Sequence, residues 1–162
     1  MDERAAIVTD NALSYGDVLP EGGALLGLDL GTKTIGVATC DAGWRYATAC
    51  KTIARSKFTK DCGALKAIVA ERKIEGIVIG LPRNMDGTEG PRAQASRAYA
   101  KNLAKALELP VLLWDERWST SSAESAMIGQ DMSRAKRAEK IDSHAAAVIL
   151  QGAIDALAGG GL

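Results

Sequence analysis

Cysteine and histidine are scarce in this chain of 162 residues. The three cysteines, Cys40, Cys50 and Cys62, are odd in number and widely spaced, and no CxxC pair occurs. This pattern argues against a disulfide scaffold and a zinc site, and it is typical of reduced thiols in a cytoplasmic protein. His144 is the only histidine. Because a single histidine is more often structural than catalytic, we assign it no catalytic role.

Long hydrophobic runs and a net charge are also missing. No apolar stretch reaches the length of a membrane-spanning helix, and the acidic N-terminal residues lack the basic and apolar regions of a secretory signal. We therefore expect a cytoplasmic protein with no membrane partner. Twenty Lys and Arg balance twenty Asp and Glu, so the net charge is zero. This is mild evidence against a purely electrostatic nucleic-acid binder, although it leaves room for a local basic face.

The remaining composition, 47% hydrophobic and 25% charged, is that of an ordinary globular domain. The hydrophobic pattern predicts the order βββ-α-β-α-β-α-α, which is typical of an α/β protein with a mixed sheet and helices on both faces. The predicted elements are a hairpin at 25–38, a strand at 44–53, a helix from Thr59 or Asp61 to Lys73, a strand at 76–81, a helix at 94–107, a strand at 111–114, a helix near 123–128 and a helix at 141–157. The last helix is expected to bury Ile141, Ala145, Val148 and Gly152.

The hairpin carries the first functional candidate. An apolar run ends at Asp29, a Gly-Thr-Lys turn follows, and a second apolar run leads away. An acid in such a run is expensive unless it is paired, hydrogen-bonded or bound to a metal. Asp29 is therefore a functional candidate, and a turn-capping aspartate is the alternative. Gly27, inside the first strand, suggests the close approach of another backbone or of a ligand.

Further carboxylates occur where other elements end or begin. Asp115 and Glu116 follow an apolar strand, and Asp142 stands in the first turn of the last predicted helix, one position off its expected buried stripe. Taken singly, each acid is also explained as a solvated loop residue or as a partner of the helix dipole. Taken together, three carboxylates at sheet ends and helix starts can converge on a hard divalent cation. Such a site would activate water to attack a phosphodiester.

Four segments of the chain form a set of motifs that occur in a fixed order. They are Leu26–Ala38 (LGLDLGTKTIGVA), Gly80–Arg92 (GLPRNMDGTEGPR), Trp114–Thr120 (WDERWST) and Ile141–Gln151 (IDSHAAAVILQ). Together they resemble the motifs of the YqgF/RuvX family. The resemblance implies a ribonuclease H-like fold with a five-stranded sheet, whose first three strands are antiparallel, and flanking helices. It runs from about residue 24 to 157, so we expect an N-terminal extension at 1–23, a nuclease domain at 24–158 and a disordered tail at 159–162.

The same resemblance implies an acidic catalytic triad of Asp29, Glu116 and Asp142 that binds Mg²⁺ or Mn²⁺. Asp115 stands beside the third-motif position and is left open as a supporting group or an alternative ligand. The family is described both as pre-16S rRNA nucleases and as Holliday-junction-resolvase-like proteins. We therefore expect a metal-dependent nuclease that processes the 5′ end of precursor 16S rRNA during ribosome biogenesis, with branched DNA as the alternative substrate.

Candidate substrate contacts surround these acids. The loop at 82–91 is long for a compact α/β unit, and such loops are often functional. A lysine follows the Gly-Thr turn, an arginine follows Glu116, and a basic run leads to Asp142. That run is either a solvated helix end or a patch that tracks phosphates. The substrate-binding candidates are Lys33, Asn84, Arg92, Arg117, Arg134, Lys136 and Arg137.

Two other functions remain open for the sequence. The hairpin turn also resembles the phosphate loop of actin-like ATPases and sugar kinases, but those proteins need two such domains and this chain is too short for both. A non-catalytic RNA-binding factor for ribosome assembly would keep the fold and the substrate contacts without turnover. Both a monomer and a homodimer fit the sequence, and resolution of branched DNA would favour a two-fold dimer.

Overall fold

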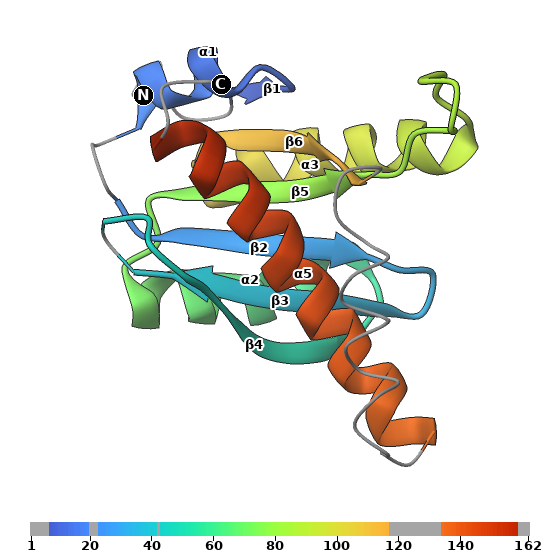
Figure 1. Ribbon diagram of the computed structural model, residues 1–162. Helices are drawn as coiled ribbons and strands as arrows, with labels where there is room; N and C mark the ends of the chain where they lie inside the picture. The colour runs from blue at the N-terminus through green and yellow to red at the C-terminus, as the bar shows by residue number, and fades with distance from the viewer. Residues whose placement is uncertain (1–6, 20–22, 42, 117–133, 159–162) are drawn as a thin grey trace.

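One mixed sheet of six strands forms the centre of the computed structural model, which describes residues 7–19, 23–41, 43–116 and 134–158 (Figure 1). The strand order is β1-β6-β5-β2-β3-β4. β2, β3 and β4 are antiparallel neighbours, whereas β5 runs parallel to β2 and the parallel order continues through β6 to β1. The predicted α/β class and antiparallel meander are confirmed. The strands are β1 (Val8–Thr9), β2 (Leu25–Leu30), β3 (Thr34–Cys40), β4 (Ala47–Ala54), β5 (Gly76–Leu81) and β6 (Val111–Asp115).

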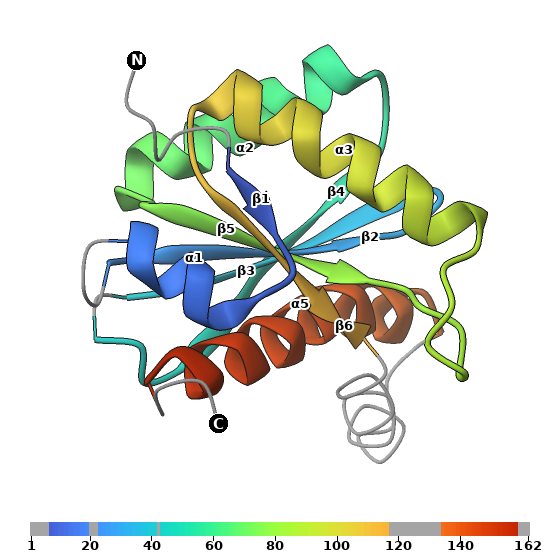
Figure 2. The ribbon, with the colours of Figure 1, turned by 90° about the horizontal axis from the view of Figure 1, so that it is seen from above.

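Helices cover both faces of this sheet (Figure 2). The helices α2 (Phe58–Arg72) and α3 (Pro91–Leu107) lie on one face, and α1 (Ala12–Val18) and α5 (Arg134–Ala158) lie on the other. Two hydrophobic cores result, one between the sheet and α2 and α3, and one between the sheet, α1 and α5. Among the described helices, none is long and apolar enough to span a membrane.

Strand β2 contributes to both cores because alternate residues of a strand point to opposite faces. Leu26, Leu28 and Leu30 pack under α2 and α3, whereas Leu25 packs under α5. Asp29 shares the parity of Leu25, so its side chain belongs to the α5 face. The alternation therefore gives β2 an apolar face under α2 and α3. On the opposite face, near the carboxyl end of the strand, it places Asp29.

Gly27 allows helix α5 to lie close to the sheet. A Cβ atom at this position would stand 2.7 Å from Leu150 Cβ and 3.1 Å from the carbonyl oxygen of Ala146. Both distances are shorter than ordinary van der Waals contact, so a larger residue would push the helix away. The close approach that the sequence suggested at this glycine is therefore made by the backbone of α5.

The N-terminal segment is part of the same packed unit. β1 adds a sixth strand beside β6, which corrects the expected number of five. The Tyr15 side chain is fully buried, and its hydroxyl donates toward the carbonyl oxygens of Ile77 at 3.0 Å and Pro110 at 3.1 Å. Ile77 belongs to β5, and Pro110 directly precedes the neighbouring parallel strand β6. Tyr15 thus ties α1 to the centre of the sheet.

Several predicted boundaries shift. α2 begins at Phe58 with Lys57 as its N-cap residue, and the Asp61 carboxylate instead accepts a hydrogen bond from the Ser56 amide at 2.9 Å. β4 begins at Ala47 rather than at residue 44, and α3 begins at Pro91 rather than at residue 94. α5 begins at Arg134, so it includes the basic run that the sequence placed before the last helix. The helix expected near 123–128 lies outside the described residues.

Candidate active site

The carboxyl ends of β2, β5 and β6 bring the first two predicted acids together. In the parallel part of the sheet, Leu28 of β2 pairs with Ile79 of β5, so Asp29 stands level with Gly80. Gly80 in turn pairs with Trp114 of β6, two residues before Glu116. Adjacent parallel strands end at the same edge of a sheet, and this register therefore sets Asp29 and Glu116 on the two sides of β5.

Asp29 and Glu116 form a hydrogen-bonded pair on the α5 side of the sheet. Burial raises the pKa of the Glu116 carboxyl to about 8, and the charge of Asp29 and the hydrogen bond to it act in the same direction. Arg92 opposes this shift through its positive charge, while Asp115 adds to it. In the absence of a cation, the pair therefore holds a proton at neutral pH.

Gly80 leaves the space that Glu116 occupies. A Cβ atom on Gly80 would stand 2.5 Å from Glu116 Oε1 and 2.6 Å from Ile149 Cδ1 of α5. Distances this short are not seen between a real Cβ and its neighbours. A side chain between the two acids is thus excluded, and β5 separates them only by its backbone.

Asp115 has different surroundings from Glu116. Strand alternation directs it to the α3 side of the sheet, where its buried carboxylate lies 3.5 Å from Arg83 Nη1. Arg83 also approaches the carboxylates of Asp10 at 3.1 Å and Glu89 at 3.4 Å. Of the two roles left open for Asp115, the structure supports the supporting group, because Asp115 holds the arginine of the 82–91 loop.

The third predicted ligand, Asp142, belongs to helix α5, but its side chain lies outside the described residues. In the described part of the chain, no three His, Cys, Asp or Glu side chains come together as a metal site. The described portion of the predicted triad is therefore the pair of Asp29 and Glu116. α5 itself passes over this pair, since Ile149 contacts the space beside Gly80.

The predicted substrate contacts differ in how close they come to the acid pair. Arg92, at the start of α3, is near enough for its charge to act on Glu116. Lys33 is exposed in the β2–β3 turn. Asn84 closes its own loop, because its amide group donates to Thr88 Oγ1 at 3.0 Å and its backbone N–H donates to Thr88 O at 2.8 Å. The side chains of Arg117, Arg134, Lys136 and Arg137 lie outside the described residues.

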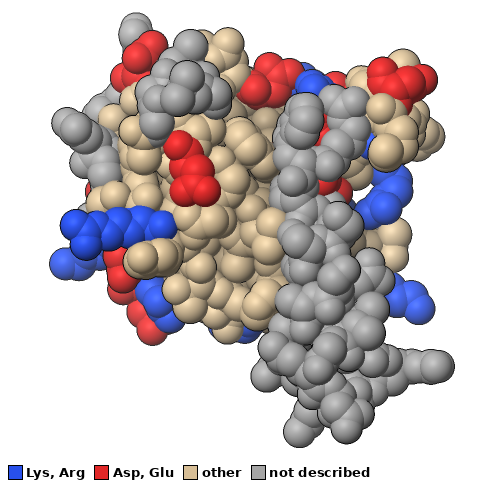
Figure 3. Space-filling view, viewed as in Figure 1, with Lys and Arg blue, Asp and Glu red and all other residues tan. Residues whose placement is uncertain are grey.

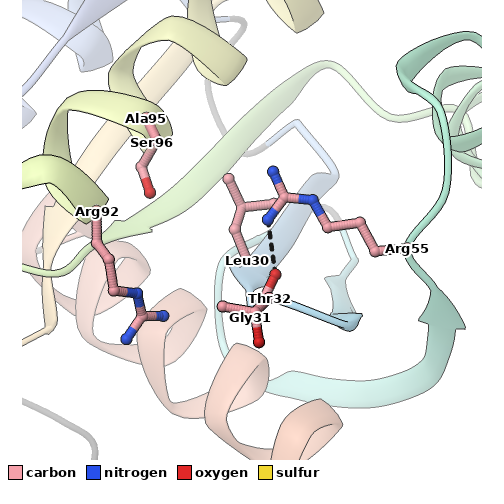
Figure 4. Close-up of a pocket in the computed structure, with 7 residues that line it drawn as sticks. All are labelled: Leu30, Gly31, Thr32, Arg55, Arg92, Ala95 and Ser96. Atoms are coloured by element: carbon pink, nitrogen blue, oxygen red, sulfur yellow. Dashed lines mark hydrogen bonds between the residues drawn. The ribbon is translucent and has the colours of Figure 1, made fainter.

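A pocket of about 110 Å³ lies on the other side of the β2 end and contains a residue that the sequence did not single out (Figure 4). Arg55 follows β4 directly, and its Nη1 donates to Gly31 O at 2.6 Å. The pairing register of the strands is the feature that could have indicated the position of Arg55. Thr34 pairs with Ala54, so the antiparallel meander brings the residue after β4 beside the β2–β3 turn. The lining residues are Leu30, Gly31, Thr32, Arg55, Arg92, Ala95 and Ser96.

Charged side chains of both signs are distributed around the face that carries α5 (Figure 3). Much of the described surface on this face bears no charge, and no continuous basic surface covers its described part. The zero net charge of the chain thus agrees with a mixed surface here. Positive charge near the acids comes from individual residues, Arg92 among the described ones.

Comparison with known proteins identifies the family. The model of the family described as RuvX, Holliday junction resolvase, matches residues 23–156. This protein belongs to the RuvX family. The match spans β2 through most of α5 and includes all four motifs on which the resemblance was based.

Relatives and solved structures agree with this assignment. A protein of Novosphingobium aromaticivorans, provisionally named pre-16S rRNA nuclease, is 67% identical over 94% of this chain and 98% of its own length. A protein of Sphingopyxis alaskensis with the same name is 62% identical over 93% of this chain and 99% of its own. The structure of Thermus thermophilus RuvC with a Holliday junction substrate has a TM-score of 0.54 at 13% identity, covering 84% of this chain and 96% of that one. The expected ribonuclease H-like fold is confirmed by this likeness.

Proposed function

We propose that this RuvX-family protein is a divalent-metal-dependent nuclease that hydrolyses phosphodiesters with Asp29, Glu116 and Asp142. The observation that carries the proposal is the hydrogen-bonded Asp29–Glu116 pair at the carboxyl end of the parallel strands. Two adjacent, partly buried carboxyl groups oppose each other's ionisation, because desolvation and mutual repulsion both disfavour their charged forms. A site that binds a cation gives them a role.

The donor atoms fit Mg²⁺ or Mn²⁺, since hard cations take oxygen ligands and the pair supplies carboxylate oxygens. The raised pKa of Glu116 marks a place where positive charge is favoured, and a bound cation would replace the proton held there. Asp142 is supported as a third ligand by its position in α5. It stands one helical turn before Ala146, whose carbonyl oxygen lies against Gly27, two residues before Asp29.

The residues of the chain have separable tasks in this reaction. When bound, a divalent cation lowers the pKa of water and neutralises charge that develops on the phosphodiester. Asp29 and Glu116 would hold the cation, and Glu116 must first lose its proton to do so. Arg92 places a positive charge beside Glu116 and would hold a phosphate of the substrate. Lys33, Asn84, Arg117 and the basic start of α5 remain proposed contacts along the nucleic acid.

We propose a precursor of 16S rRNA as the substrate, because the two relatives described above, which match over almost their full lengths, carry that name. Branched DNA is the second candidate, favoured by the description of the family model. A protein with this substrate would act in the cytoplasm. Cleavage of a four-way junction would be expected from a homodimer with two sites, whereas cleavage of RNA requires only a monomer.

The deciding experiment compares cleavage of a precursor 16S rRNA fragment and of a four-way DNA junction in Mn²⁺ or Mg²⁺. We expect Asp29→Asn, Glu116→Gln and Asp142→Asn to lower the rate by roughly 100-fold or more, because each removes a charged ligand. Glu71→Gln, an exposed acid on α2, is the matched control and should keep full activity. Wild-type cleavage rates in Asp29→Asn would refute the proposed centre. Tight RNA binding by wild type with no cleavage of either substrate would favour the assembly-factor alternative.

A further inference from the structure

The pocket in Figure 4 has the chemistry of an anion site. Its two charged side chains, Arg55 and Arg92, approach from opposite walls, one after β4 and one at the start of α3. Ser96 is largely buried, and its hydroxyl is directed toward the space between them. Thr32, an exposed residue of the β2–β3 turn, also lines the pocket. Among the described residues that line the pocket there is no acid, so nothing within its lining neutralises the two guanidinium groups.

Arg55 is held in place before any ligand arrives. Its Nη1 donates to Gly31 O at 2.6 Å, and its guanidinium carbon lies 5.2 Å from the centre of the Tyr99 ring. A guanidinium group has five N–H donors, so donors remain for a ligand after the bond to Gly31. A stacked and hydrogen-bonded arginine loses little side-chain entropy on binding. The pocket is therefore preorganised for an oxyanion rather than assembled by it.

The pocket is separated from the acid pair only by the end of strand β2. Leu30 and Gly31, which line it, follow Asp29 directly, and Arg92 both lines it and acts on the charge of Glu116. A chain of nucleic acid that presents one phosphodiester to Asp29 and Glu116 would carry its neighbouring phosphates along this end of the sheet. The basic pocket thus lies where a flanking phosphate would pass.

We propose that Arg55, Arg92, Ser96 and Thr32 form a binding site for one backbone phosphate of the nucleic-acid substrate, next to the phosphodiester that is cleaved. This inference rests on the proposed nuclease function and extends it to a second contact point. The site fixes the distance between a held phosphate and the acid pair, and so selects which phosphodiester is presented. Both arginines contact the same phosphate.

Binding without turnover tests the site separately from the chemistry. Affinity for a labelled single-stranded RNA is measured by fluorescence anisotropy in EDTA, over a range of KCl concentrations, for wild type, Arg55→Ala, Arg92→Ala and the double variant. One lost phosphate contact lowers the slope of log affinity against log salt by about 0.7 to 1. We expect each single variant to weaken binding by about five- to twenty-fold and the double variant to lower the slope by no more than one contact. Arg72→Ala, an exposed arginine at the end of α2, should change neither quantity.

The position of the phosphate is tested with RNA that carries one neutral methylphosphonate at successive positions around the cleavage site. Wild type should bind more weakly when the methylphosphonate replaces the phosphate at one flanking position. Arg92→Ala already lacks this contact, so the same replacement should not weaken its binding further. An unchanged affinity in Arg92→Ala, or a salt slope in the double variant that falls by two contacts, would overturn the shared site. Arg92 is exposed, so Arg92→Ala should fold even if Arg55→Ala does not. If Arg55→Ala does not fold, Arg55→Lys is used in its place. RNA cleavage in EDTA would contradict metal dependence and leave these binding results intact.

Discussion

The two sides of the β2 end carry opposite charge, although they are built from consecutive residues. Asp29 faces α5 and pairs with Glu116 in a partly buried acid site, whereas Leu30 and Gly31 line a pocket with two arginines on the α3 side. The acid side has a raised carboxyl pKa and would attract a cation. The basic side has no acid among its described lining residues and would attract a phosphate.

Under the proposed function, this difference would let one strand serve both charges of a metal-dependent phosphodiester hydrolysis. Strand alternation places the proposed cation site and the proposed phosphate site on opposite faces of one strand. Arg92 is the exception, because it lines the pocket and also lowers the pKa of Glu116. The charge of Arg92 therefore acts on both sides. Variants that affect only one side measure what each side contributes to activity and stability.

The largest effect is expected from Gly80→Ala, which disturbs only the acid side. The new methyl group would overlap Glu116 Oε1 and Ile149 Cδ1, so the Glu116 side chain must leave its place beside Asp29. We expect a loss of cleavage of about 100-fold and a loss of roughly 1–3 kcal/mol in the free energy of unfolding. Urea unfolding and cleavage rates measure the two effects.

Gly63→Ala is the matched control for that variant. No described atom lies within 4 Å of a Cβ at Gly63, which is exposed in α2. Alanine should raise the free energy of unfolding by roughly 0.5–1 kcal/mol there, because it favours the helix, and it should leave cleavage unchanged. Full activity in Gly80→Ala would show that the position of Glu116 beside Asp29 is not needed for the reaction.

The strands that carry the acid pair were predicted from the sequence, because their evidence is local, whereas the choice of Asp29 and Glu116 as a pair rested on the family resemblance. The apolar β-branched run at 76–81 and the run before Asp115 and Glu116 each identify a buried strand. The positions of Asp29 and Glu116 then follow from the parallel order of the strands. The basic side was missed because Arg55 reaches it through the register of β3 and β4. No local pattern around Arg55 indicates a partner such as Gly31.

The buried face of α5 was predicted only in part, for a different reason. Ala145 is buried as predicted, and the side chain of Ile141 lies outside the described residues. The expected stripe included Val148 and Gly152, which are only partly buried, whereas Ala146, Ile149 and Leu150 are fully or almost fully buried. Three consecutive alanines, 145–147, give almost no hydrophobic contrast around the helix, and the fit against Gly27 decides which of them faces the sheet. The two-residue strand β1 was equally invisible, because its stability comes from pairing with β6 and from the burial of Tyr15.

A second difference between the two sides is their dependence on pH. In the metal-free protein the pKa of Glu116 is raised to about 8, above the value of 4.5 for an ordinary glutamate. Between these pH values the folded state binds a proton that the unfolded state has lost, so the free energy of unfolding falls as pH rises. We expect a fall of at least about 1.4 kcal/mol, the equivalent of one pKa unit, in urea unfolding in EDTA from pH 5 to pH 8.

Variants assign this pH dependence to the acid side. Glu116→Gln removes the titrating group and should flatten the profile. Asp29→Asn removes the neighbouring charge and hydrogen-bond partner but keeps the burial of Glu116, so it should only reduce the fall. Arg55→Ala lies on the basic side and should keep the fall, at a different overall stability. An equal slope in Glu116→Gln and in wild type would place the responsible group elsewhere in the chain.

The smallest effect is expected from a change at Asp10, a residue of the N-terminal segment that contacts Arg83 of the 82–91 loop. Asp10 is half exposed and accepts hydrogen bonds from Arg83 at 3.1 Å and Arg97 at 3.3 Å. Exposed ion pairs contribute about 1 kcal/mol at most and are screened by salt. Asp10→Asn should therefore lower the free energy of unfolding by less than about 1 kcal/mol in 50 mM KCl and by less still in 1 M KCl. Because Arg83 also contacts Asp115, next to Glu116, a several-fold loss of cleavage with unchanged stability would instead show that Asp10 positions the acid side through that arginine.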